Sequence, residues 1–444
     1  MNGVSAAGSA RFHVAPGGRL AGELTVPGDK SISHRALMLG GVASGDTRIS
    51  GFLAGEDCLA TARALAALGV AIERPAETEV LVHGVGSRGF SAPGANLDLG
   101  NAGTAMRLLT GLLAPQRFNS TLVGDASLMR RPMQRVVAPL EMMGARIRTH
   151  EGRPPVEIRG TPRLRAIHYS LPIASAQVKS AVLLAALNAA GRTHITEPAP
   201  SRDHTERMLG AFGAKVGREG RSITFEGGQT LRGTHVTVPA DFSSAAFFLV
   251  AGCLAAGQGL LLRNVGVNPT RTGLLDLLQR MGADIRVHPR TASGAPHAEP
   301  VADLEVHQSA LHGITVPESL VPLAIDEFPV FFIAAACASG ETLVRGALEL
   351  RVKESDRLEA VATGLATLGV EHELLPDGLW LRGAEDFSGG SIDSRGDHRI
   401  AMAFAVAALR ARAAIEIADV ANVATSFPGF VASARAVGLA VEAL

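Results

Sequence analysis

One pattern of apolar and polar positions repeats along the chain. Six times, a segment with helical periodicity ends in an apolar residue and a glycine and is followed by a short strand-like run. A glycine at a helix C-terminus supplies the left-handed conformation that ends the helix. Six such endings, 69 to 87 residues apart, predict a repeated unit, because unrelated helix ends would not be so evenly spaced. The glycines are Gly69, Gly144, Gly213, Gly282, Gly369 and Gly438.

The six units also open alike, with a short β-like run and a polar loop before a long apolar helix. A second strand, another polar loop and a second helix lead to the glycine, and two further strand-like runs follow it. This order predicts a βαβαββ unit and an α/β fold. The six openings lie at residues 25–30, 97–101, 169–172, 236–241, 314–317 and 392–397.

The two ends of the chain complement each other. The sixth unit reaches Leu444 without the closing strand of the other five, whereas a β-like run at 11–14 has no unit of its own. We therefore expect residues 1–21 to complete the sixth unit. This predicts an N-terminal domain of residues 22–234 with repeats one to three, and a discontinuous C-terminal domain of residues 1–21 and 235–444 with repeats four to six. One continuous ring is the alternative, which the missing strand and the one longer spacing disfavour.

Composition narrows the class of protein. Forty-two basic and 42 acidic side chains cancel, which argues against a protein that coats nucleic acid or a membrane surface. With 47% hydrophobic and 19% charged residues, the chain is globular. Its apolar runs are shorter than the roughly 18 residues of a membrane helix, and the N-terminus lacks the features of a secretory signal. Three cysteines without metal-ligand spacing fit a reducing compartment, so we expect a soluble cytoplasmic protein that binds no metal.

Distinctive polar residues gather in the loops that open the first helices. Lys30 and Ser31 are expected at a helix N-terminus, where free N–H groups and the helix dipole favour an anion, and Arg35 lies one turn further on. The glycine-rich segment 100–103 would let a ligand approach the backbone closely. Segment 175–180 places hydroxyl and amide groups at another helix start. A serine N-cap beside surface cations is the alternative interpretation of these loops.

Acidic residues open two helices in the second half of the chain. Asp326 and Glu327 precede the apolar run 330–333, which is a poor setting for idle charge. An aspartate near a buried face and opposite cations is a candidate general base, although an ordinary N-cap is the alternative. The sixth unit has the same form, with Asp397 directly before His398 and Arg399.

The loops before the second helices add further cations. They contain Arg130 and Arg131 in the second unit, Arg202 in the third, and the segment 353–357 in the fifth. Any one of these is ordinarily a solvated surface charge. Because the loops recur at equivalent positions of the repeat, symmetry would bring them to one face of each domain. Two facing domains would then enclose a cationic cleft that suits a small polyanion, such as a phosphate-bearing substrate.

These loops are similar to those of the 5-enolpyruvylshikimate-3-phosphate synthase family, the enolpyruvyl transferases of the shikimate pathway. The likeness covers nearly the whole chain and rests on several long motifs in the same order. The resemblance implies a two-domain inside-out α/β barrel with three βαβαββ units in each domain and a discontinuous C-terminal domain, in agreement with the count above. The most specific motifs are residues 29–35, 99–107, 351–357 and 397–402.

The resemblance also implies a reaction. Phosphoenolpyruvate is protonated on its methylene carbon while the 5-hydroxyl of shikimate 3-phosphate attacks C2, which forms a tetrahedral intermediate. Loss of phosphate with deprotonation of the methyl group then leaves the enolpyruvyl ether. Neither a metal nor an organic cofactor takes part, in keeping with the missing ligand clusters.

Carried over position by position, the resemblance implies two neighbouring substrate sites. Lys30 would contact both substrates and take part in proton transfer. Asp326 would accept the proton of the 5-hydroxyl group, and Glu354 would exchange a proton at the methylene carbon. Shikimate 3-phosphate would be held by Lys30, Ser31, Arg35, Ser175, Ala176, Gln177, Arg202, Asp326 and Lys353. Phosphoenolpyruvate would be held by Lys30, Gly103, Arg131, Gln177, Arg357, His398 and Arg399.

The chain departs from the family pattern at two places. Many members carry a lysine two residues before a Phe-Pro pair near the C-terminus, where this chain has Thr425. Some members place a tyrosine against the shikimate ring, where this chain has segment 202–206. That segment, together with 268–271, resembles another branch of the family.

Two other functions are weaker alternatives. A sister transferase acting on UDP-N-acetylglucosamine shares the fold and uses a loop cysteine. Cys253 and Cys337 lie in apolar helices, and no family motif surrounds Cys58, which begins a second helix and could be exposed. A non-enzymatic repeat scaffold is disfavoured by the zero net charge and by the acids at 326–327. We expect a monomer that acts on small molecules and has no nucleic-acid or membrane partner.

Overall fold

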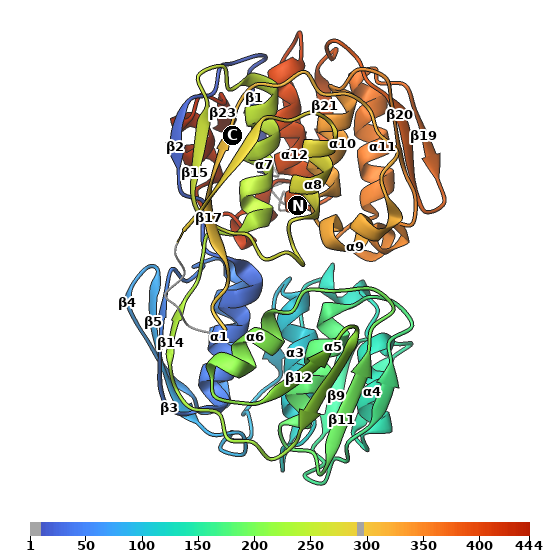
Figure 1. Ribbon diagram of the computed structural model, residues 1–444. Helices are drawn as coiled ribbons and strands as arrows, with labels where there is room; N and C mark the ends of the chain where they lie inside the picture. The colour runs from blue at the N-terminus through green and yellow to red at the C-terminus, as the bar shows by residue number, and fades with distance from the viewer. Residues whose placement is uncertain (1–9, 291–296) are drawn as a thin grey trace, which may run out of the picture.

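The computed structural model describes residues 10–290 and 297–444, which form two stacked lobes (Figure 1). The lower lobe, here the N-terminal domain, holds the blue to green part of the chain. The upper lobe, the C-terminal domain, holds the yellow to red part together with the first two strands. No helix of the described residues is long and apolar enough to cross a membrane.

Each domain contains three small sheets, and in all of them except that of the fifth unit the first two strands run parallel and the later ones antiparallel. In the N-terminal domain the sheets are, in strand order, β14 (His235–Thr237), β3 (Ser44–Ser50), β5 (Glu79–Val85) and β4 (Ala71–Ala76); β6 (Leu97–Asp98), β7 (Asn119–Val123), β9 (Arg153–Arg159) and β8 (Arg146–His150); and β10 (His168–Ser170), β11 (Arg192–Thr196), β13 (Ser222–Glu226) and β12 (Val216–Glu219).

The sheets of the C-terminal domain follow the same plan. The fifth unit has one strand fewer, because its opening run is reduced to the single parallel bridge between Thr315 and Leu343. In strand order they are β2 (Gly22–Leu24), β15 (Leu260–Gly266), β17 (Val301–Val306) and β16 (Ile285–Pro289); β18 (Glu341–Val344), β20 (Gly378–Arg382) and β19 (His372–Leu375); and β21 (Gly390–Asp393), β22 (Ile415–Ala418), β1 (Arg11–Val14) and β23 (Val441–Ala443).

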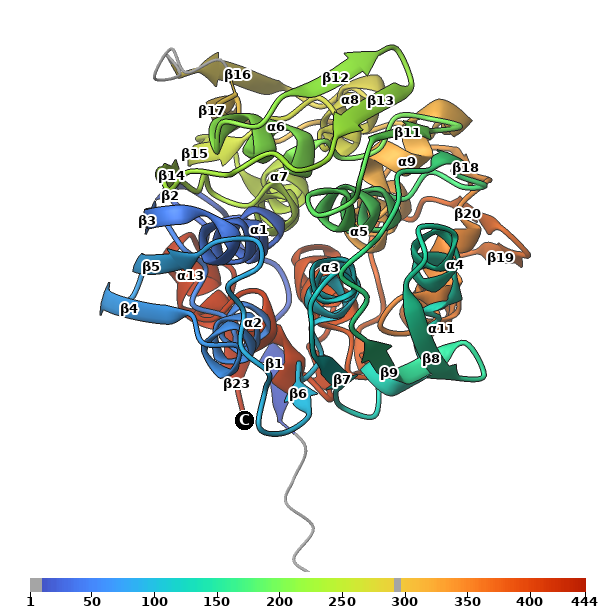
Figure 2. The same cartoon turned by 90° about the horizontal axis from the view of Figure 1, so that it is seen from below.

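Helices form an inner and an outer set in each domain, and Figure 2 shows the inner helices of the N-terminal domain end-on within a ring of outer helices and strands. Its inner helices are α1 (Lys30–Val42), α3 (Gly103–Leu113) and α5 (Ala176–Ala186), and its outer ones α2 (Glu56–Ala67), α4 (Gln134–Met142) and α6 (His204–Ala211). In the C-terminal domain the inner helices are α7 (Phe242–Ala255), α10 (Phe328–Ala336) and α12 (His398–Ala407), and the others α8 (Gly273–Arg280), α9 (Val321–Ala324), α11 (Arg357–Leu368) and α13 (Phe430–Ala436).

The repeat predicted from the sequence is confirmed. The six predicted glycines all have left-handed φ angles, between 81° and 102°, which a residue with a Cβ adopts at a cost. Strand β1 pairs with β22 through Arg11↔Ala418 and with β23 through Val14↔Val441. The N-terminal run therefore completes the sixth sheet, as the missing closing strand predicted.

The two opening strands near the predicted domain boundaries are exchanged. Strand β2, expected in the first unit, pairs with β15 of the fourth unit (Leu24↔Leu262), while β14, expected in the fourth, pairs with β3 of the first (Thr237↔Ser50). The chain thus crosses between the domains at 25–29 and 238–241, a few residues after the predicted boundaries at 22 and 235. The two crossings are bound to each other, since Asp29 N donates to Pro239 O at 2.8 Å and Asp241 N to Pro27 O at 2.8 Å.

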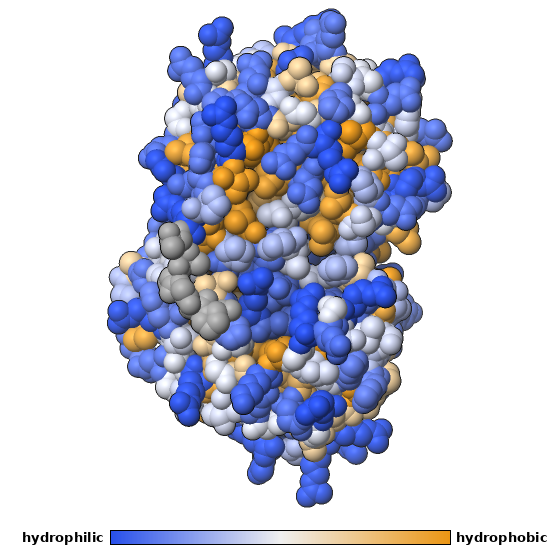
Figure 3. All heavy atoms as spheres, viewed as in Figure 1, coloured by the Kyte–Doolittle hydropathy of each residue, from blue (hydrophilic) through white to orange (hydrophobic). Residues whose placement is uncertain are grey.

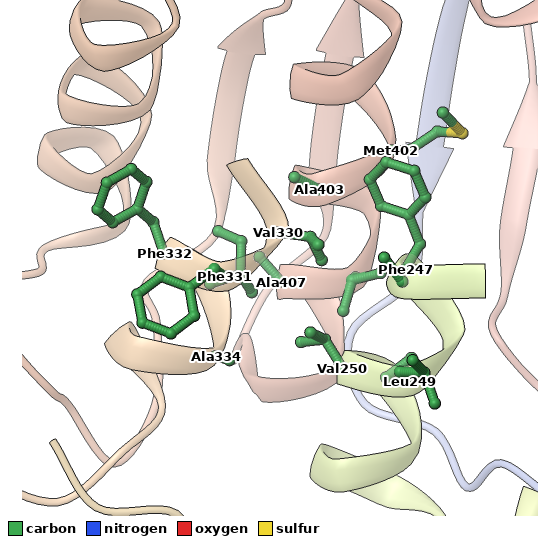
Figure 4. Close-up of a cluster of buried hydrophobic side chains, with 14 of the residues drawn as sticks. Phe247, Leu249, Val250, Val330, Phe331, Phe332, Ala334, Met402, Ala403 and Ala407 are labelled. Carbon is green, nitrogen blue, oxygen red and sulfur yellow. The ribbon is translucent and has the colours of Figure 1, made fainter. Parts of the chain in front are cut away.

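Each domain has its own apolar core around its inner helices. In the C-terminal core, α10, α12 and α7 pack against one another, with Val330 and Val250 between them, while the rings of Phe331 and Phe332 lie on the side of α10 away from α12 (Figure 4). In the N-terminal core, α3 and α5 instead approach backbone to backbone, because a Cβ on Gly111 would lie 2.2 Å from the carbonyl oxygen of Ala181. The inner helices are thereby fixed, and their N-terminal ends meet between the domains.

Candidate functional site

The N-terminal ends of the inner helices and the adjoining loops line a cavity between the domains. Ten cationic and four acidic side chains line it, so the cavity has a large excess of positive charge. Hydrophilic side chains also gather on the outer surface directly below the junction of the lobes (Figure 3). The lining includes every site residue predicted from the sequence except Ser175.

Helix α1 presents two of the predicted substrate-binding cations. The helix begins because the Asp29 carboxylate caps it, accepting from Ile32 N at 2.8 Å. Lys30 is the first helical residue, and its Nζ lies 3.0 Å from Asp57 Oδ2 at the start of α2. Arg35 is buried and donates from Nε to Thr205 Oγ1 at 2.7 Å, which fixes its guanidinium against α6. Ser31, between them, lines the cavity.

Helix α3 begins at a close approach between glycine and two guanidinium groups. A Cβ on Gly103 would lie 2.9 Å from Nη1 of both Arg107 and Arg131, so a side chain there would displace them. Among the residues that the structure describes, no carboxylate pairs with Arg107. Burial and the nearby charges of Arg135 and Arg131 lower the pKa of Arg107 to about 9. A buried guanidinium in such surroundings favours a bound anion.

Helix α5 contributes amide and backbone groups. Ser175 is its N-cap and its Oγ accepts from Val178 N at 3.5 Å, so the ordinary capping role applies to this side chain in the structure. Ala176 and Gln177 line the cavity, and Gln177 Nε2 donates to Thr104 Oγ1 of α3 at 3.1 Å. The predicted role of Gln177 in substrate binding therefore has a suitable location.

Asp326, the predicted base, lies among four cations of both domains. Its carboxylate is 2.5 Å from Arg202 Nη2, 3.2 Å from Lys353 Nζ and 3.4 Å from Arg357 Nη1, and its carbonyl accepts from Arg399 Nη1 at 3.1 Å. Burial alone would raise the pKa of Asp326, but the opposing cations, Lys353 foremost, hold it well below its usual range. The carboxylate is thus ionised, and Arg202 reaches it from the N-terminal domain.

Glu354 contacts the same guanidinium, that of Arg357, as Asp326 does. Its Oε2 lies 2.6 Å from Arg357 Nη2, and its Oε1 lies 3.4 Å from Arg131 Nη1 of the N-terminal domain. Burial opposes ionisation, yet Arg357 and then Arg131 hold the pKa of Glu354 well below its usual range. Both candidate acid–base groups are therefore bound to the cations that the sequence assigned to the substrates.

His398 and Arg399 begin α12, whose cap is the buried carboxylate of Asp397, accepting from Arg399 N at 2.9 Å. The same carboxylate holds Arg357 through its Nε at 2.8 Å. Burial, and after it the charge of Lys30, holds the pKa of His398 well below its usual range, so this imidazole is neutral. His398 can therefore serve as a hydrogen-bond donor without adding to the charge of the cavity.

Several lining residues were missed at the level of sequence, namely Asp57, Thr104, Arg107, Arg135, Asp241 and Arg271. Arg107 and Thr104 lie inside a quoted motif, and Arg271 lies in segment 268–271, so their motifs were a usable signal. No motif in the sequence pointed to Asp57 or Arg135. The sequence allowed an exposed position for Cys58, but the side chain is fully buried behind Lys30. Burial raises the pKa of its thiol well above the usual range.

The fold and the cleft define a two-domain α/β protein with a cationic site suited to small polyanions. A family model described as EPSP synthase (3-phosphoshikimate 1-carboxyvinyltransferase) matches residues 14–433, and the chain belongs to the EPSP synthase family.

Individual relatives agree. A 3-phosphoshikimate 1-carboxyvinyltransferase of Alkalilimnicola ehrlichii is 60% identical over 431 residues, 97% of this chain and 96% of the relative. One of Methylococcus capsulatus is 58% identical over 433 residues, 97% and 98% of the two chains. The solved structure of EPSP synthase from Acinetobacter baumannii is 50% identical, with a TM-score of 0.86, and the match covers 98% of this chain and 100% of that one.

Proposed function

We propose that this protein transfers the enolpyruvyl group of phosphoenolpyruvate to the 5-hydroxyl of shikimate 3-phosphate and releases phosphate. Membership of the family supports the reaction type. The observation that carries the substrate class is the cavity, where ten cations face four carboxylates. Two phosphate groups and two carboxylates, which the two substrates together provide, would compensate this excess.

The residue roles belong to the same proposal. Arg202 and Lys353 bind the phosphorylated shikimate, Arg131 and Arg357 bind phosphoenolpyruvate, and Asp326 takes the 5-hydroxyl proton. The cations that hold the pKa of Asp326 low are the ones assigned to the substrates. A bound phosphate would compensate those charges, so substrate binding would raise the pKa of Asp326 and make its carboxylate a better base.

The same reasoning applies to Glu354. Its carboxylate is bound to Arg357 and Arg131, two of the three arginines assigned to phosphoenolpyruvate. When the anionic groups of that substrate take over these arginines, the carboxyl group becomes free to carry the proton that joins and later leaves the methylene carbon. Each substrate would thereby prepare its own acid–base group, and cations fixed in advance would stabilise the charged intermediate.

Phosphate release tests the proposal. Purified protein should release inorganic phosphate from phosphoenolpyruvate only when shikimate 3-phosphate is present, and mass spectrometry should detect the enolpyruvyl ether in equal amount. Reactions with each substrate alone, and with UDP-N-acetylglucosamine in place of the shikimate, serve as controls. Absence of phosphate release with both substrates, or release with the UDP-sugar, would contradict it.

A further inference from the structure

The loop between β15 and α8 connects the two domains through residues that the proposed reaction does not use. It contains segment 268–271, of sequence Asn-Pro-Thr-Arg, in the C-terminal domain. Asn268 and Arg271 are 2% and 3% exposed, and both contact aspartates of the N-terminal domain. A polar side chain buried to this degree is retained only with well-placed partners, which directs attention to what these two residues hold.

Arg271 joins the N-caps of two inner helices from opposite domains. Its Nη2 donates to Asp241 Oδ1 at 2.9 Å and to Ser243 Oγ at 2.7 Å on α7, and its Nη1 lies 3.8 Å from Asp29 Oδ2 at α1. Asp241 Oδ2 in turn accepts from the backbone N of Lys30 at 3.4 Å. The guanidinium therefore lies between the two carboxylates that fix the first residue of α1.

The two carboxylates need that cation. Asp29 and Asp241 are 4% and 5% exposed, and each caps its own helix. Burial and the nearby charge of Asp29 raise the pKa of Asp241, which shows how costly the pair would be alone. A lysine in place of Arg271 would keep the charge, but a single ammonium cannot reach Asp29, Asp241 and Ser243 with the fork geometry of a guanidinium.

Asn268 makes an equivalent connection to α6. Its Nδ2 donates to Asp203 Oδ1 at 2.7 Å and to Glu299 Oε2 at 2.8 Å, while its Oδ1 accepts from Thr270 N at 2.9 Å. Asp203 directly follows Arg202, whose guanidinium lies 2.5 Å from Asp326. The amide of Asn268 therefore holds the residue next to a second cation of the cleft.

We propose that Asn268 and Arg271 are positioning residues, each of which sets one substrate-binding cation of the N-terminal domain from the C-terminal domain. Arg271 sets Lys30 through Asp29 and Asp241, and Asn268 sets Arg202 through Asp203. The inference rests on the proposed function, because Lys30 and Arg202 are placed in the site by that proposal. A displacement of about 1 Å in a group that binds or transfers can cost up to about 100-fold in rate.

The two residues act on different steps, which makes them separable. Arg271→Lys should lower kcat by about tenfold or more with smaller changes in both KM values, because Lys30 takes part in proton transfer. Asn268→Ala should raise KM for shikimate 3-phosphate by about tenfold with kcat nearly unchanged, because Arg202 binds that substrate. Steady-state kinetics with each substrate varied in turn gives both values.

A double-variant cycle tests the route of action. If Asn268 acts through Asp203, the variant Asn268→Ala/Asp203→Ala should show the KM of Asp203→Ala alone, whereas independent roles would multiply the two increases. Asn188→Ala is the matched control, since Asn188 is a buried asparagine that bonds Ser87 and Arg88 and does not line the cavity. It should lower the unfolding midpoint and leave kcat and both KM values unchanged.

The outcomes separate this inference from the proposed function. If the unsubstituted protein forms no enolpyruvyl ether, the proposed function fails. If it does, but Arg271→Lys and Asn268→Ala keep its kcat and KM values, only the positioning roles fail; multiplied increases in the double variant would overturn the route through Asp203. Should Asn268→Ala not fold, Asn268→Ser keeps a donor of smaller size, and calorimetric binding of shikimate 3-phosphate to it should be weakened; unchanged binding would overturn the role of Asn268.

Discussion

The two domains share one topology but differ in what their inner helices contain. In the N-terminal domain, α1, α3 and α5 each carry a buried cation within the first two turns, Arg35, Arg107 and Lys179. In the C-terminal domain, α7, α10 and α12 are preceded by the acids Asp241, Glu327 and Asp397 and continue as largely apolar helices. The N-terminal domain therefore brings six of the ten cations of the cleft, whereas the C-terminal domain brings four cations and three of the four carboxylates.

This difference explains why the cleft requires both halves. Asp326 is kept ionised by Lys353 of its own domain and then by Arg202, which approaches it across the junction, and Glu354 is bound by Arg131 across the same junction. The N-terminal side of the cleft holds six cations and one acid, so carboxylates of the C-terminal domain compensate part of its charge. Substitutions in the two domains should consequently differ in their effects on activity and on stability.

The largest effect is expected on turnover, from a substitution of a carboxylate of the C-terminal domain. Asp326→Asn removes the proposed base while keeping its shape, so turnover should fall by about 100- to 10,000-fold. Affinity for shikimate 3-phosphate should change far less, because the cations around Asp326 remain. Single-turnover kinetics and calorimetry measure the two quantities, with Asp276→Asn on the exposed side of α8 as the control. Turnover close to that of the control would remove Asp326 from the base role.

A large loss of stability is expected from a substitution of a buried cation of the N-terminal domain. Lys179 is fully buried, with Nζ 3.1 Å from Glu197 Oε1 and 2.7 Å from Glu206 Oε1. Lys179→Met leaves two buried carboxylates without a cation and should lower the free energy of unfolding by about 3 to 5 kcal/mol. The double variant Lys179→Met/Glu197→Gln should recover part of this loss in urea unfolding. No recovery would mean that packing, not charge, is the cause.

Sequence reasoning captured this contrast only in part. The six glycines and the helix starts were predictable, because capping and periodicity are local properties. The exchange of β2 and β14 was not, since a short opening strand pairs equally well with either unit and only the crossing at 25–29 decides. Likewise, Asp57 looks like a surface charge in the sequence, because its burial depends on which helices surround it.

Helix packing in the two domains can be compared through two glycine variants with smaller expected losses of stability. A Cβ on Gly111 of α3 would lie 2.2 Å from the backbone oxygen of Ala181, whereas one on Gly364 of α11 would lie 2.0 Å from the ring of Phe404. Gly111→Ala must separate two inner helices and should cost about 3 kcal/mol, while Gly364→Ala can be met by side-chain shifts at about 1 to 2 kcal/mol. Urea unfolding of both variants measures the difference.

The two glycine variants should also differ in activity. Gly111 lies one turn after Arg107 in α3 and meets a fixed backbone, so the displacement of α3 reaches the cleft directly. Gly364 lies about two turns after Arg357 in α11 and meets the ring of Phe404, which can shift. We expect KM for phosphoenolpyruvate to rise more in Gly111→Ala than in Gly364→Ala. If both variants lose the same free energy of unfolding and have the same KM, contact with a backbone and contact with an aromatic ring are equivalent in the two domains.

The smallest effect is expected on the pH dependence of stability, which reports on the ion pairs of Asp326 with the cations of both domains. The pKa of Asp326 in the folded protein lies well below its usual range, so its ionisation stabilises the fold above the pKa of the unfolded chain, about 4. That contribution is lost as the pH falls through the folded-state value. Asp326→Asn should therefore be less stable than the parent protein by about 1 to 2 kcal/mol at neutral pH, and the gap should narrow below about pH 4.

Urea unfolding of the parent protein and Asp326→Asn at a series of pH values measures this gap, with Asp276→Asn again as the control. Added phosphate should stabilise Asp326→Asn more than the parent protein, because the variant leaves Arg202 and Lys353 without their carboxylate. A gap that widens as the pH falls would contradict the sign of the pKa shift. The same experiment then shows whether the cations of one domain depend on the carboxylate of the other, since a gap of zero at neutral pH would mean that water alone satisfies them.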